Sequence, residues 1–297
     1  MNLVKKYASL VKFSHTIFAL PFAIIGFFIG LYAHSFSSDT TLQRSTFSPK
    51  LFILVVLCMV FARSAAMAFN RYLDSSFDAK NPRTAIREIP AGIISKQSAL
   101  GFVILNCLLF IASSYFINPI CFYLSPVALL VVLFYSYTKR FTALCHLVLG
   151  IGLSLAPIGA YLAVTGKFDL LPLLFSFTVL FWVSGFDIIY ALQDEQFDKE
   201  NQLYSMPAAL GKKKALTVSE YLHLFSAACI LFAGIYGHFG WFFWIGVAVF
   251  IGMLLYQHSI VKPNDLSKVN IAFMTANGIA SVVFAVFVLL DIFLRSK

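Results

Sequence analysis

Charged residues are scarce in this chain, and long apolar runs take their place. Only 12% of its 297 residues are Asp, Glu, Lys or Arg, whereas 60% are hydrophobic, and the mean hydropathy is +0.85. Soluble globular proteins are about one-quarter charged and about half apolar, so this composition excludes a soluble globule. It also excludes long disordered regions, which have too few apolar residues to form a core. The composition therefore indicates a protein that crosses a membrane several times.

Cysteine motifs are lacking as well. None of the five cysteines is spaced as C-x-x-C and all fall within apolar segments, so neither a disulfide framework nor a zinc site is indicated. In a soluble protein the net charge of +9 would suggest a nucleic-acid partner. Here the basic residues lie in connections between apolar runs, where they orient a membrane protein, and no nucleic-acid partner is expected.

Apolar runs of about 20 residues predict nine transmembrane helices. Runs of this length match the hydrocarbon core of a bilayer, about 30 Å thick, and they are too long and unbroken for the strands of a β-barrel. We therefore expect an all-α fold in which residues 1–297 form one membrane-embedded domain. The expected spans are 16–35, 51–70, 98–116, 119–136, 143–164, 170–190, 216–236, 239–259 and 270–293.

The distribution of Lys and Arg predicts the orientation in the membrane. With the N-terminus in the cytoplasm, 16 of the 22 basic residues lie on the cytoplasmic side and five on the opposite side. An odd number of spans then places the C-terminus outside. The long charged connections 71–97 and 191–215 both lie on the cytoplasmic face, where we expect them to cap the bundle and carry the chemistry.

Two acidic segments continue these spans, and each has its polar residues four positions apart. Asn70, Asp74 and Asp78 extend the second span, and Asp194 and Asp198 extend the sixth. On a helix, steps of four place side chains on one face, about 6 Å apart along the axis. Because both segments leave the membrane on the same side, the two acidic faces can meet across a shared cavity.

Carboxylate pairs without histidine or cysteine favour a hard cation. Mg²⁺ in particular is bound through a few carboxylates together with phosphate oxygens, so two such sites could hold one diphosphate between them. The alternative interpretation is that the acids form ordinary surface ion pairs at helix ends. Basic residues near both segments could contact phosphate oxygens: Arg71, Lys80, Arg83, Arg87, Lys139, Arg140 and Lys212, Lys213 and Lys214.

At these residues the sequence resembles the UbiA superfamily of intramembrane aromatic prenyltransferases. Three blocks carry the resemblance: NRYLDSSFD at 70–78 with its continuation to 92, YTKRFT at 137–142, and YALQDEQFD at 190–198. The resemblance implies nine helices around a central, laterally open cavity with a cytoplasmic cap. It also implies that Mg²⁺, held by both aspartate motifs, binds the diphosphate of a polyprenyl donor in the inner membrane of a bacterium.

The resemblance also implies roles for particular residues. The metal set would be Asn70, Asp74, Asp78, Asp194 and Asp198. The partners of the phosphate oxygens would be Arg71, Lys139 and Arg140. The metal stabilises charge on the leaving diphosphate, the allylic carbon becomes cationic, and an aromatic ring attacks it in an apolar cavity that excludes water.

Arg63 lies inside the second span, seven residues before Asn70 and therefore about two turns deeper on the same helix face. A charged side chain there costs about 3 kcal/mol unless it is paired, so it marks a functional position. We expect Arg63 to contact the carboxylate of the acceptor or the inner phosphate. The alternative is an ion pair with Asp187 of the sixth span, although Asp187 could instead accept the proton that the ring loses.

The residues expected to act in catalysis are therefore Asp187, Asp194 and Arg63. Tyr190 and His146 are expected to join Arg63 in binding the substrate. The alternative for both is an ordinary packed polar residue, which is common inside helical bundles.

The acceptor is not fixed by these motifs. The Asn-Pro-Arg-Thr run at 81–84 and the block at 190–194 are most similar to the bacterial branch that prenylates 4-hydroxybenzoate for respiratory quinones. The block at 63–70 is similar to relatives that use a dihydroxynaphthoate for menaquinone. We expect a polyprenyl diphosphate, a small aromatic acid and the lipid bilayer as partners, and no obligate protein partner. A cation-coupled transporter is the alternative of another class, although transporter sites usually lie nearer the bilayer midplane.

Overall fold

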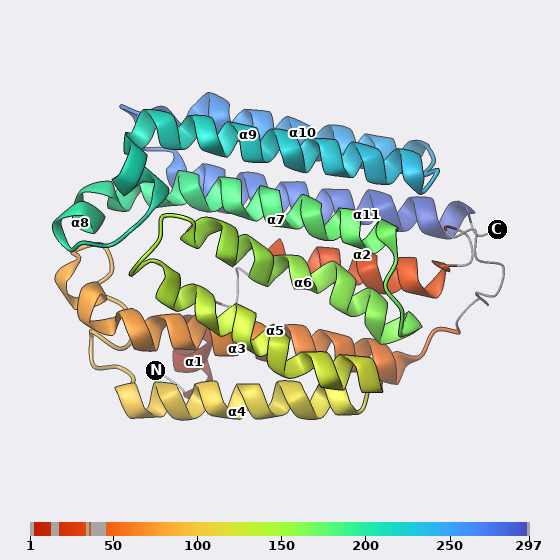
Figure 1. The fold of residues 1–297 in the computed structure, drawn as a ribbon, viewed down its shortest axis with the longest axis horizontal. Coiled ribbons are helices and arrows are strands. Elements are labelled where there is room, and N and C mark those ends of the chain that lie inside the picture. Colours follow the sequence, from red (N-terminus) through yellow and green to blue (C-terminus); the bar gives the residue numbers. More distant parts are fainter. Residues whose placement is uncertain (1–2, 13–17, 34–35, 37–45, 296–297) are drawn as a thin grey trace.

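The computed structural model describes residues 3–12, 18–33, 36 and 46–295, and these form a bundle of helices (Figure 1). Within the described residues the only β pairing is an isolated bridge between Lys262 and Asp265, so the expected all-α fold is confirmed. The long helices are α2 (Leu20–Leu31), α3 (Pro49–Lys80), α4 (Lys96–Tyr115), α5 (Pro119–Thr138), α6 (Cys145–Thr165), α7 (Leu170–Ala191), α9 (Met206–Tyr236), α10 (Trp241–Ile260) and α11 (Asn277–Arg295). The shorter elements are α1 (Leu3–Leu10), the 3₁₀ turn η3 (Leu192–Asp194), α8 (Glu195–Glu200) and the π-helical segment η4 (Ile271–Ala276).

Eight of the described helices are long and apolar enough to cross a membrane. The remaining apolar helix, α2, has 12 residues and is about 18 Å long, which is shorter than the hydrocarbon core. The expected count of nine spans is therefore not confirmed over the described residues. Both ends of the expected first span, 16–35, include residues that lie outside the described part of the chain.

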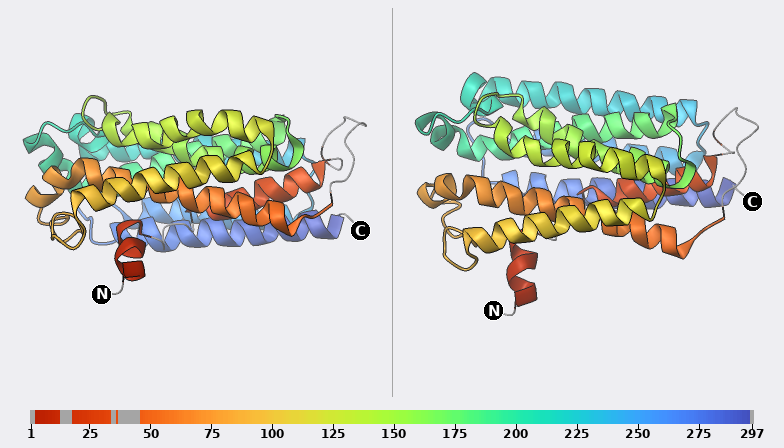
Figure 2. Two further views of the ribbon diagram at one scale, coloured as in Figure 1. Left: turned by 90° about the horizontal axis from the view of Figure 1, so that it is seen from below. Right: turned by 60° about the horizontal axis from the view of Figure 1, so that its bottom comes forward.

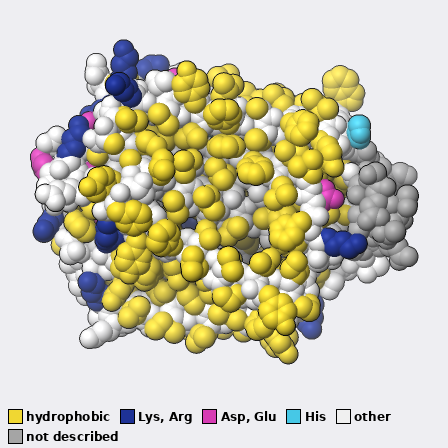
Figure 3. Space-filling model, in the orientation of Figure 1, with side chains coloured by type: hydrophobic (Ala, Val, Ile, Leu, Met, Phe, Trp, Pro, Cys, Tyr) yellow, Lys and Arg dark blue, Asp and Glu magenta, His cyan; other side chains and the backbone are white. Residues whose placement is uncertain are grey.

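The long helices lie side by side along one direction, and α1 stands across them (Figures 1 and 2). The turns of residues 81–95 lie at the same end of the bundle as α8, and α11 ends at the opposite end. Hydrophobic side chains cover the middle of the molecule, while Lys and Arg gather mainly at the α8 end (Figure 3). This belt identifies an integral membrane protein with one strongly polar end.

Aromatic packing fixes α7 in the centre of the bundle. The ring of Trp182 is fully buried, with ring centroids 5.4 Å from Phe22 of α2 and 5.6 Å from Phe250 of α10. Phe284 of α11 lies 5.8 Å from Phe22. Such pairs contribute about 1 kcal/mol each beyond the area they bury. They hold α7 rigidly against α2, α10 and α11.

α6 lies close against two neighbouring helices because glycine stands at the contacts. A Cβ atom on Gly26 of α2 would lie 2.1 Å from the carbonyl oxygen of Pro157, and one on Gly150 would lie 2.5 Å from that of Leu180 on α7. Either contact is far below van der Waals distance, so a larger residue would force the helices apart. α6 is therefore tied to the rigid side of the bundle.

The helix that carries the first acidic segment is longer than the expected span. α3 starts at an N-cap in which the Ser48 hydroxyl accepts a hydrogen bond from the backbone of Leu51, and it continues past residue 70 to Lys80. The first ten residues of the expected cap 71–97 are thus helical. Asn70, Asp74 and Asp78 share one continuous helix, as their spacing predicts.

The second acidic segment is not a single helix. α7 ends at Ala191, Asp194 closes the 3₁₀ turn η3, and Asp198 belongs to the short helix α8. α9 then begins at Met206, ten residues before the expected span, and Gly211 interrupts it with a φ of +78°. The expected cap segment 191–215 is therefore largely helical, whereas 71–97 is helical only at its two ends, and the step of four between Asp194 and Asp198 crosses a bend.

Candidate active site

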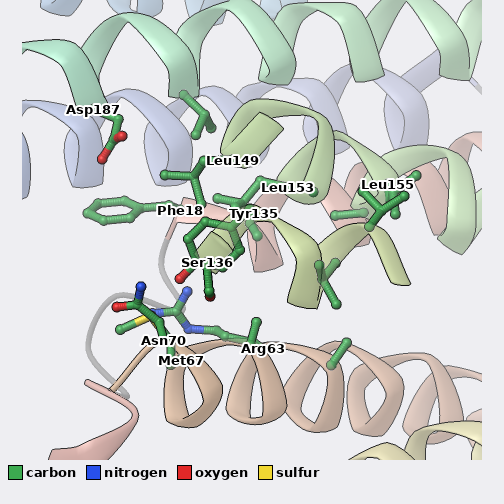
Figure 4. Close-up of a pocket in the computed structure, with 18 of the residues that line it drawn as sticks. Phe18, Arg63, Met67, Asn70, Tyr135, Ser136, Leu149, Leu153, Leu155 and Asp187 are labelled. Atoms are coloured by element: carbon green, nitrogen blue, oxygen red, sulfur yellow. The ribbon is translucent and has the colours of Figure 1, made fainter. Parts of the chain in front are cut away.

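A cavity of about 620 Å³ lies among α3, α5, α6 and α7 (Figure 4). It reaches from the polar residues at the α8 end far into the apolar interior. Arg63 and Asn70 of α3 lie on one side of it and Asp187 of α7 on the other. All four aspartates of the two motifs line its polar mouth, so the expected meeting of the two acidic segments at one cavity is observed.

Asp74 faces the cavity from α3 and is held by two neighbours. The amide of Asn70 donates a hydrogen bond to its Oδ2 at 3.0 Å, and Arg140 donates to its Oδ1 at 2.9 Å. Arg140 lies in the turn between α5 and α6 and also donates to the carbonyl of Leu73. This arginine therefore ties the start of α6 to the acidic face of α3.

Asp78 lies one turn further along α3 and is more deeply buried. Its Oδ1 pairs with Arg87 at 2.6 Å, whereas its Oδ2 is buried and has no hydrogen-bond partner. Thr84 donates to the backbone carbonyl of Asp78. The turns of 81–95 thus fold back over the end of α3 and leave one carboxylate oxygen unsatisfied.

Asp194 receives Arg83 from the opposite side of the mouth. The guanidinium donates to both carboxylate oxygens, at 3.0 and 2.5 Å, and Asn81 donates to Oδ1 at 3.3 Å. Burial lowers the pKa of Arg83, but the ion pair with Asp194 outweighs this effect and the pKa is raised. Arg83 therefore stays charged and links the turn after α3 to η3.

Asp198 is fully buried, with an ion pair at one carboxylate oxygen and a hydrogen bond at the other. Lys139 approaches Oδ1 to 2.7 Å, and the hydroxyl of Ser205 donates to Oδ2 at 2.8 Å. Burial lowers the pKa of Lys139, but the charge of Asp198 outweighs it and the pKa is raised. The neighbouring residues Lys139 and Arg140 thus bind acids of different motifs, which lie on opposite walls.

The expected metal cluster is not assembled in the described residues. No three His, Cys, Asp or Glu side chains there are grouped closely enough to hold a metal ion, because each aspartate is paired with a cation instead. The donor chemistry nevertheless fits Mg²⁺. The carboxylates and the Asn70 amide supply oxygen ligands, and the unsatisfied Oδ2 of Asp78 is a buried oxygen that still lacks a partner. These ion pairs line a cavity, so they differ from ordinary surface pairs.

Arg63 lines the cavity about two turns below Asn70. Its Nη2 donates to the carbonyl of Lys12 at 3.4 Å, and its buried Nε has no hydrogen-bond partner. It forms no ion pair with Asp187 among the described residues, so that alternative is wrong. The nearby Arg71 is 6% exposed, lines the cavity and also has an unpartnered Nε. Two arginines that line the cavity therefore each have a buried Nε without a hydrogen-bond partner.

Asp187 is held by a histidine rather than by an arginine. Nδ1 of His146 lies 2.7 Å from its Oδ2, while Nε2 of His146 accepts the backbone N–H of Met206 at 3.3 Å. An acceptor at Nε2 places the proton of a neutral imidazole on Nδ1, which donates to Asp187. Both ring nitrogens of His146 are thus engaged by protein groups, and the residue also lines the cavity, as expected of a substrate-binding position.

Tyr190 is likewise engaged by its neighbours. Its hydroxyl accepts a hydrogen bond from Arg83 at 3.0 Å, and its ring lies 4.2 Å from that of Phe273 in η4. The amide of Asn277 donates to the carbonyls of Ala272 and Phe273, and Trp182 donates to Asn277 at 2.8 Å. This buried network fixes the π-helical turn that brings Phe273 to the cavity.

Several cavity residues were not singled out from the sequence. Arg83 and Arg87 were counted only among nearby basic residues, although they belong to the conspicuous block that follows the first motif. Tyr135 lies one turn before Lys139 on α5, and this spacing was a usable signal. The sequence around Phe273 contains no signal for a cavity residue, because its position depends on a π-helical turn that hydrophobic periodicity does not predict.

Comparison with known proteins gives the same result as the geometry. The 4-hydroxybenzoate octaprenyltransferase of Nitrosomonas europaea is 29% identical over 252 residues, which cover 84% of each chain. That of Francisella tularensis subsp. holarctica is 27% identical over 240 residues, covering 80% of this chain and 83% of that one.

Solved structures are similar over almost the whole chain. A UbiA homolog from Aeropyrum pernix K1 has a TM-score of 0.78 at 27% identity, covering 95% of this chain and 98% of that one. A UbiA homolog from Archaeoglobus fulgidus bound to DMAPP and Mg²⁺ has a TM-score of 0.73 at 21% identity, with coverage of 97% and 99%, and shows the same fold. The profile of the UbiA prenyltransferase family matches residues 40–279, so this chain, with its two acidic motifs at one intramembrane cavity, belongs to that family and is a prenyltransferase.

Proposed function

We propose that this protein transfers a polyprenyl group from a polyprenyl diphosphate to the ring of 4-hydroxybenzoate, in the synthesis of respiratory quinones. One observation carries the proposal: a single cavity is lined by four aspartates, by Arg63 and Arg71, by Asp187 and by an apolar interior. The names of the curated relatives support the same acceptor. Family membership rules out the transporter alternative.

The polar mouth is suited to a metal-bound diphosphate. Asn70 and the four aspartates would hold Mg²⁺, which supplies positive charge against the leaving diphosphate when bound. The basic residues that now pair with the carboxylates then become available to phosphate oxygens: Arg83, Arg87, Lys139 and Arg140. Arg71, with its free Nε, already faces the same space. The site thus exchanges one set of ion pairs for another.

The deeper part of the cavity is suited to a small aromatic acid. Arg63 binds the carboxylate of the acceptor through its free Nε, and the ring then lies between Arg63 and Asp187. The bond between C1 of the donor and its oxygen breaks, and the electron pair of that bond leaves with the diphosphate. A ring carbon supplies the electron pair of the new bond to C1. The carboxylate of Asp187, oriented by His146, takes the proton that the ring carbon loses.

We also propose that the protein lies in the inner membrane of a bacterium, with the mouth of the cavity facing the cytoplasm. The excess of Lys and Arg on the connections at the α8 end supports this orientation. Labelling of single cysteines introduced at Lys80 and Lys167 in intact cells tests it. We expect an impermeant reagent to label only the position at Lys167, and labelling only at Lys80 would reverse the orientation.

Product identification tests the proposed reaction. Membranes containing the protein are incubated with labelled geranylgeranyl diphosphate and Mg²⁺, together with either 4-hydroxybenzoate or 1,4-dihydroxy-2-naphthoate. We expect a prenylated 4-hydroxybenzoate, and no product after EDTA treatment. A product from the naphthoate alone would move the protein to the menaquinone alternative, and a lack of product with both acceptors would overturn the proposal.

A further inference from the structure

The apolar part of the cavity extends along the whole length of α6, far beyond the space an aromatic acid needs. In the proposed reaction the prenyl tail of the donor lies in this part of the cavity. We infer that the open space at Gly159 decides how long a tail fits. The inference rests on the proposed prenyl transfer and adds the residue that selects the length of the tail.

The cavity runs outward from the mouth along α3. Its lining residues on this helix recur every three or four positions from Asp74 to Val55, so one helix face borders it throughout. The 19 steps from Val55 to Asp74 span about 28 Å, nearly the thickness of the hydrocarbon core. Below Arg63 the α3 lining is entirely apolar or weakly polar: Ala62, Met59, Cys58 and Val55.

α6 borders the same space from the opposite side. Leu149, Leu153 and Leu155 follow one another along it in the outward direction (Figure 4), and Gly159 continues the lining. A Cβ atom on Gly159 would meet nothing within 4 Å. By contrast, Gly150 on the same helix is closely packed against α7. Gly159 therefore keeps space open in the cavity and is not needed for helix packing.

The mouth fixes the end from which a tail must start. Arg71 lines the cavity, only 6% of it is exposed, and its buried Nε has no hydrogen-bond partner. Asp78, about two turns nearer the end of α3, adds an unsatisfied carboxylate oxygen that fits a metal bound to the diphosphate. A buried arginine beside metal-binding carboxylates suits the diphosphate end of the donor, which is the charged end. The apolar end must then extend along α6, toward Gly159.

Helix geometry converts this direction into a length. Gly159 lies 13 residues beyond His146, or about 20 Å along the axis, and Gly152 lies six residues beyond it, or about 9 Å. An isoprene unit adds four carbon–carbon bonds of about 1.5 Å and therefore about 5 Å in extended form. About two units fit above Gly152 and about four above Gly159, whereas an octaprenyl tail must pass both.

Substitution with a bulky residue tests the inference. We compare kcat/KM for geranyl, geranylgeranyl and octaprenyl diphosphate in the wild type and in Gly159→Phe. We expect the variant to keep its activity with the geranyl donor and to lose roughly ten-fold or more with the octaprenyl donor. Gly152→Leu should block earlier, so that the geranylgeranyl donor is affected as well.

The matched control is Gly252→Phe on α10. A Cβ there also meets nothing within 4 Å, but Gly252 does not line the cavity, so all three donors should react as in the wild type. Equal activity of Gly159→Phe with all donors would overturn the inference, and so would an equal loss with all of them in a protein that melts normally. A wild-type protein that uses no donor would instead contradict the proposed function itself.

Discussion

The two walls of the cavity present similar residues on very different supports. The α3 wall is one continuous helix, and only 22% of its apolar membrane-spanning stretch is buried inside the protein. For the stretch that begins with α7, 67% is buried. The α3 wall carries two arginines with free donors, Arg63 and Arg71. On the α7 wall, Asp187, Asp194 and Asp198 are each bound to a basic partner. The α7 wall is thus the more buried and preorganised one, while the α3 wall also carries two arginines that form no ion pair among the described residues.

The largest effect is expected from removing one carboxylate from either wall. Asp74→Asn and Asp194→Asn should each lower kcat by about 10²–10³-fold or more, because an amide cannot balance a cation at the diphosphate. Steady-state prenyl transfer measures this loss. Glu195→Gln is the control, since Glu195 pairs with Lys199 outside the cavity and should keep its activity. Full turnover in either aspartate variant would contradict the expectation that a carboxylate from each wall is needed for prenyl transfer.

Removing Lys139 or its neighbour Arg140 should lower the free energy of unfolding by different amounts, because their acidic partners lie on different walls. Lys139→Met leaves the fully buried Asp198 without its cation and should cost about 3–5 kcal/mol. Arg140→Met leaves Asp74, whose side chain is 23% exposed to water, and should cost about 1 kcal/mol or less.

Thermal unfolding in detergent measures both changes in stability. Adding Asp198→Asn to Lys139→Met should restore much of the loss, because the buried charge is then removed. Equal destabilisation by the two methionine variants would mean that the walls do not differ in burial of their ion pairs.

Substitutions of Asp187 and His146 test how the α7 wall contributes to proton transfer. Asp187→Asn should lower kcat by about 10²-fold, the usual contribution of a positioned base. His146→Ala should lower kcat by about ten-fold with an unchanged KM for the acceptor, because it only orients Asp187. His146→Asn, whose amide can donate in place of Nδ1, should recover part of this loss. A raised KM in His146→Ala would instead indicate direct substrate contact.

The smallest effect is expected at Arg63 on the α3 wall, and it should appear in binding. Arg63→Gln should raise the KM for 4-hydroxybenzoate by roughly ten-fold or more with little change in kcat, because one charged hydrogen bond is lost. With an acceptor that lacks the carboxylate, the wild type and the variant should react alike. A difference that persists with such an acceptor would contradict a carboxylate role.

Much of this architecture could be predicted from local sequence. Apolar runs predicted the helices, because burial in lipid requires about 20 apolar residues. Steps of four in polar residues predicted that α3 continues into Asp74 and Asp78. The count of nine spans was not confirmed, because α2 as described has only 12 residues.

The ion pairs of the mouth could not be predicted in the same way. Arg83 and Asp194 are 111 residues apart, and they meet only because the turns of 81–95 fold across the bundle end. The partner of Asp187 was likewise open, since His146 and Arg63 are both reachable in a helical bundle. Such pairings depend on how helices pack, and no periodic pattern in one segment records them.

Lys139 and Arg140 are adjacent in the chain, yet one binds Asp198 and the other binds Asp74. Two consecutive residues therefore link the two aspartate motifs. The short turn after α5 therefore joins the two aspartate motifs directly, through one side chain to each of them.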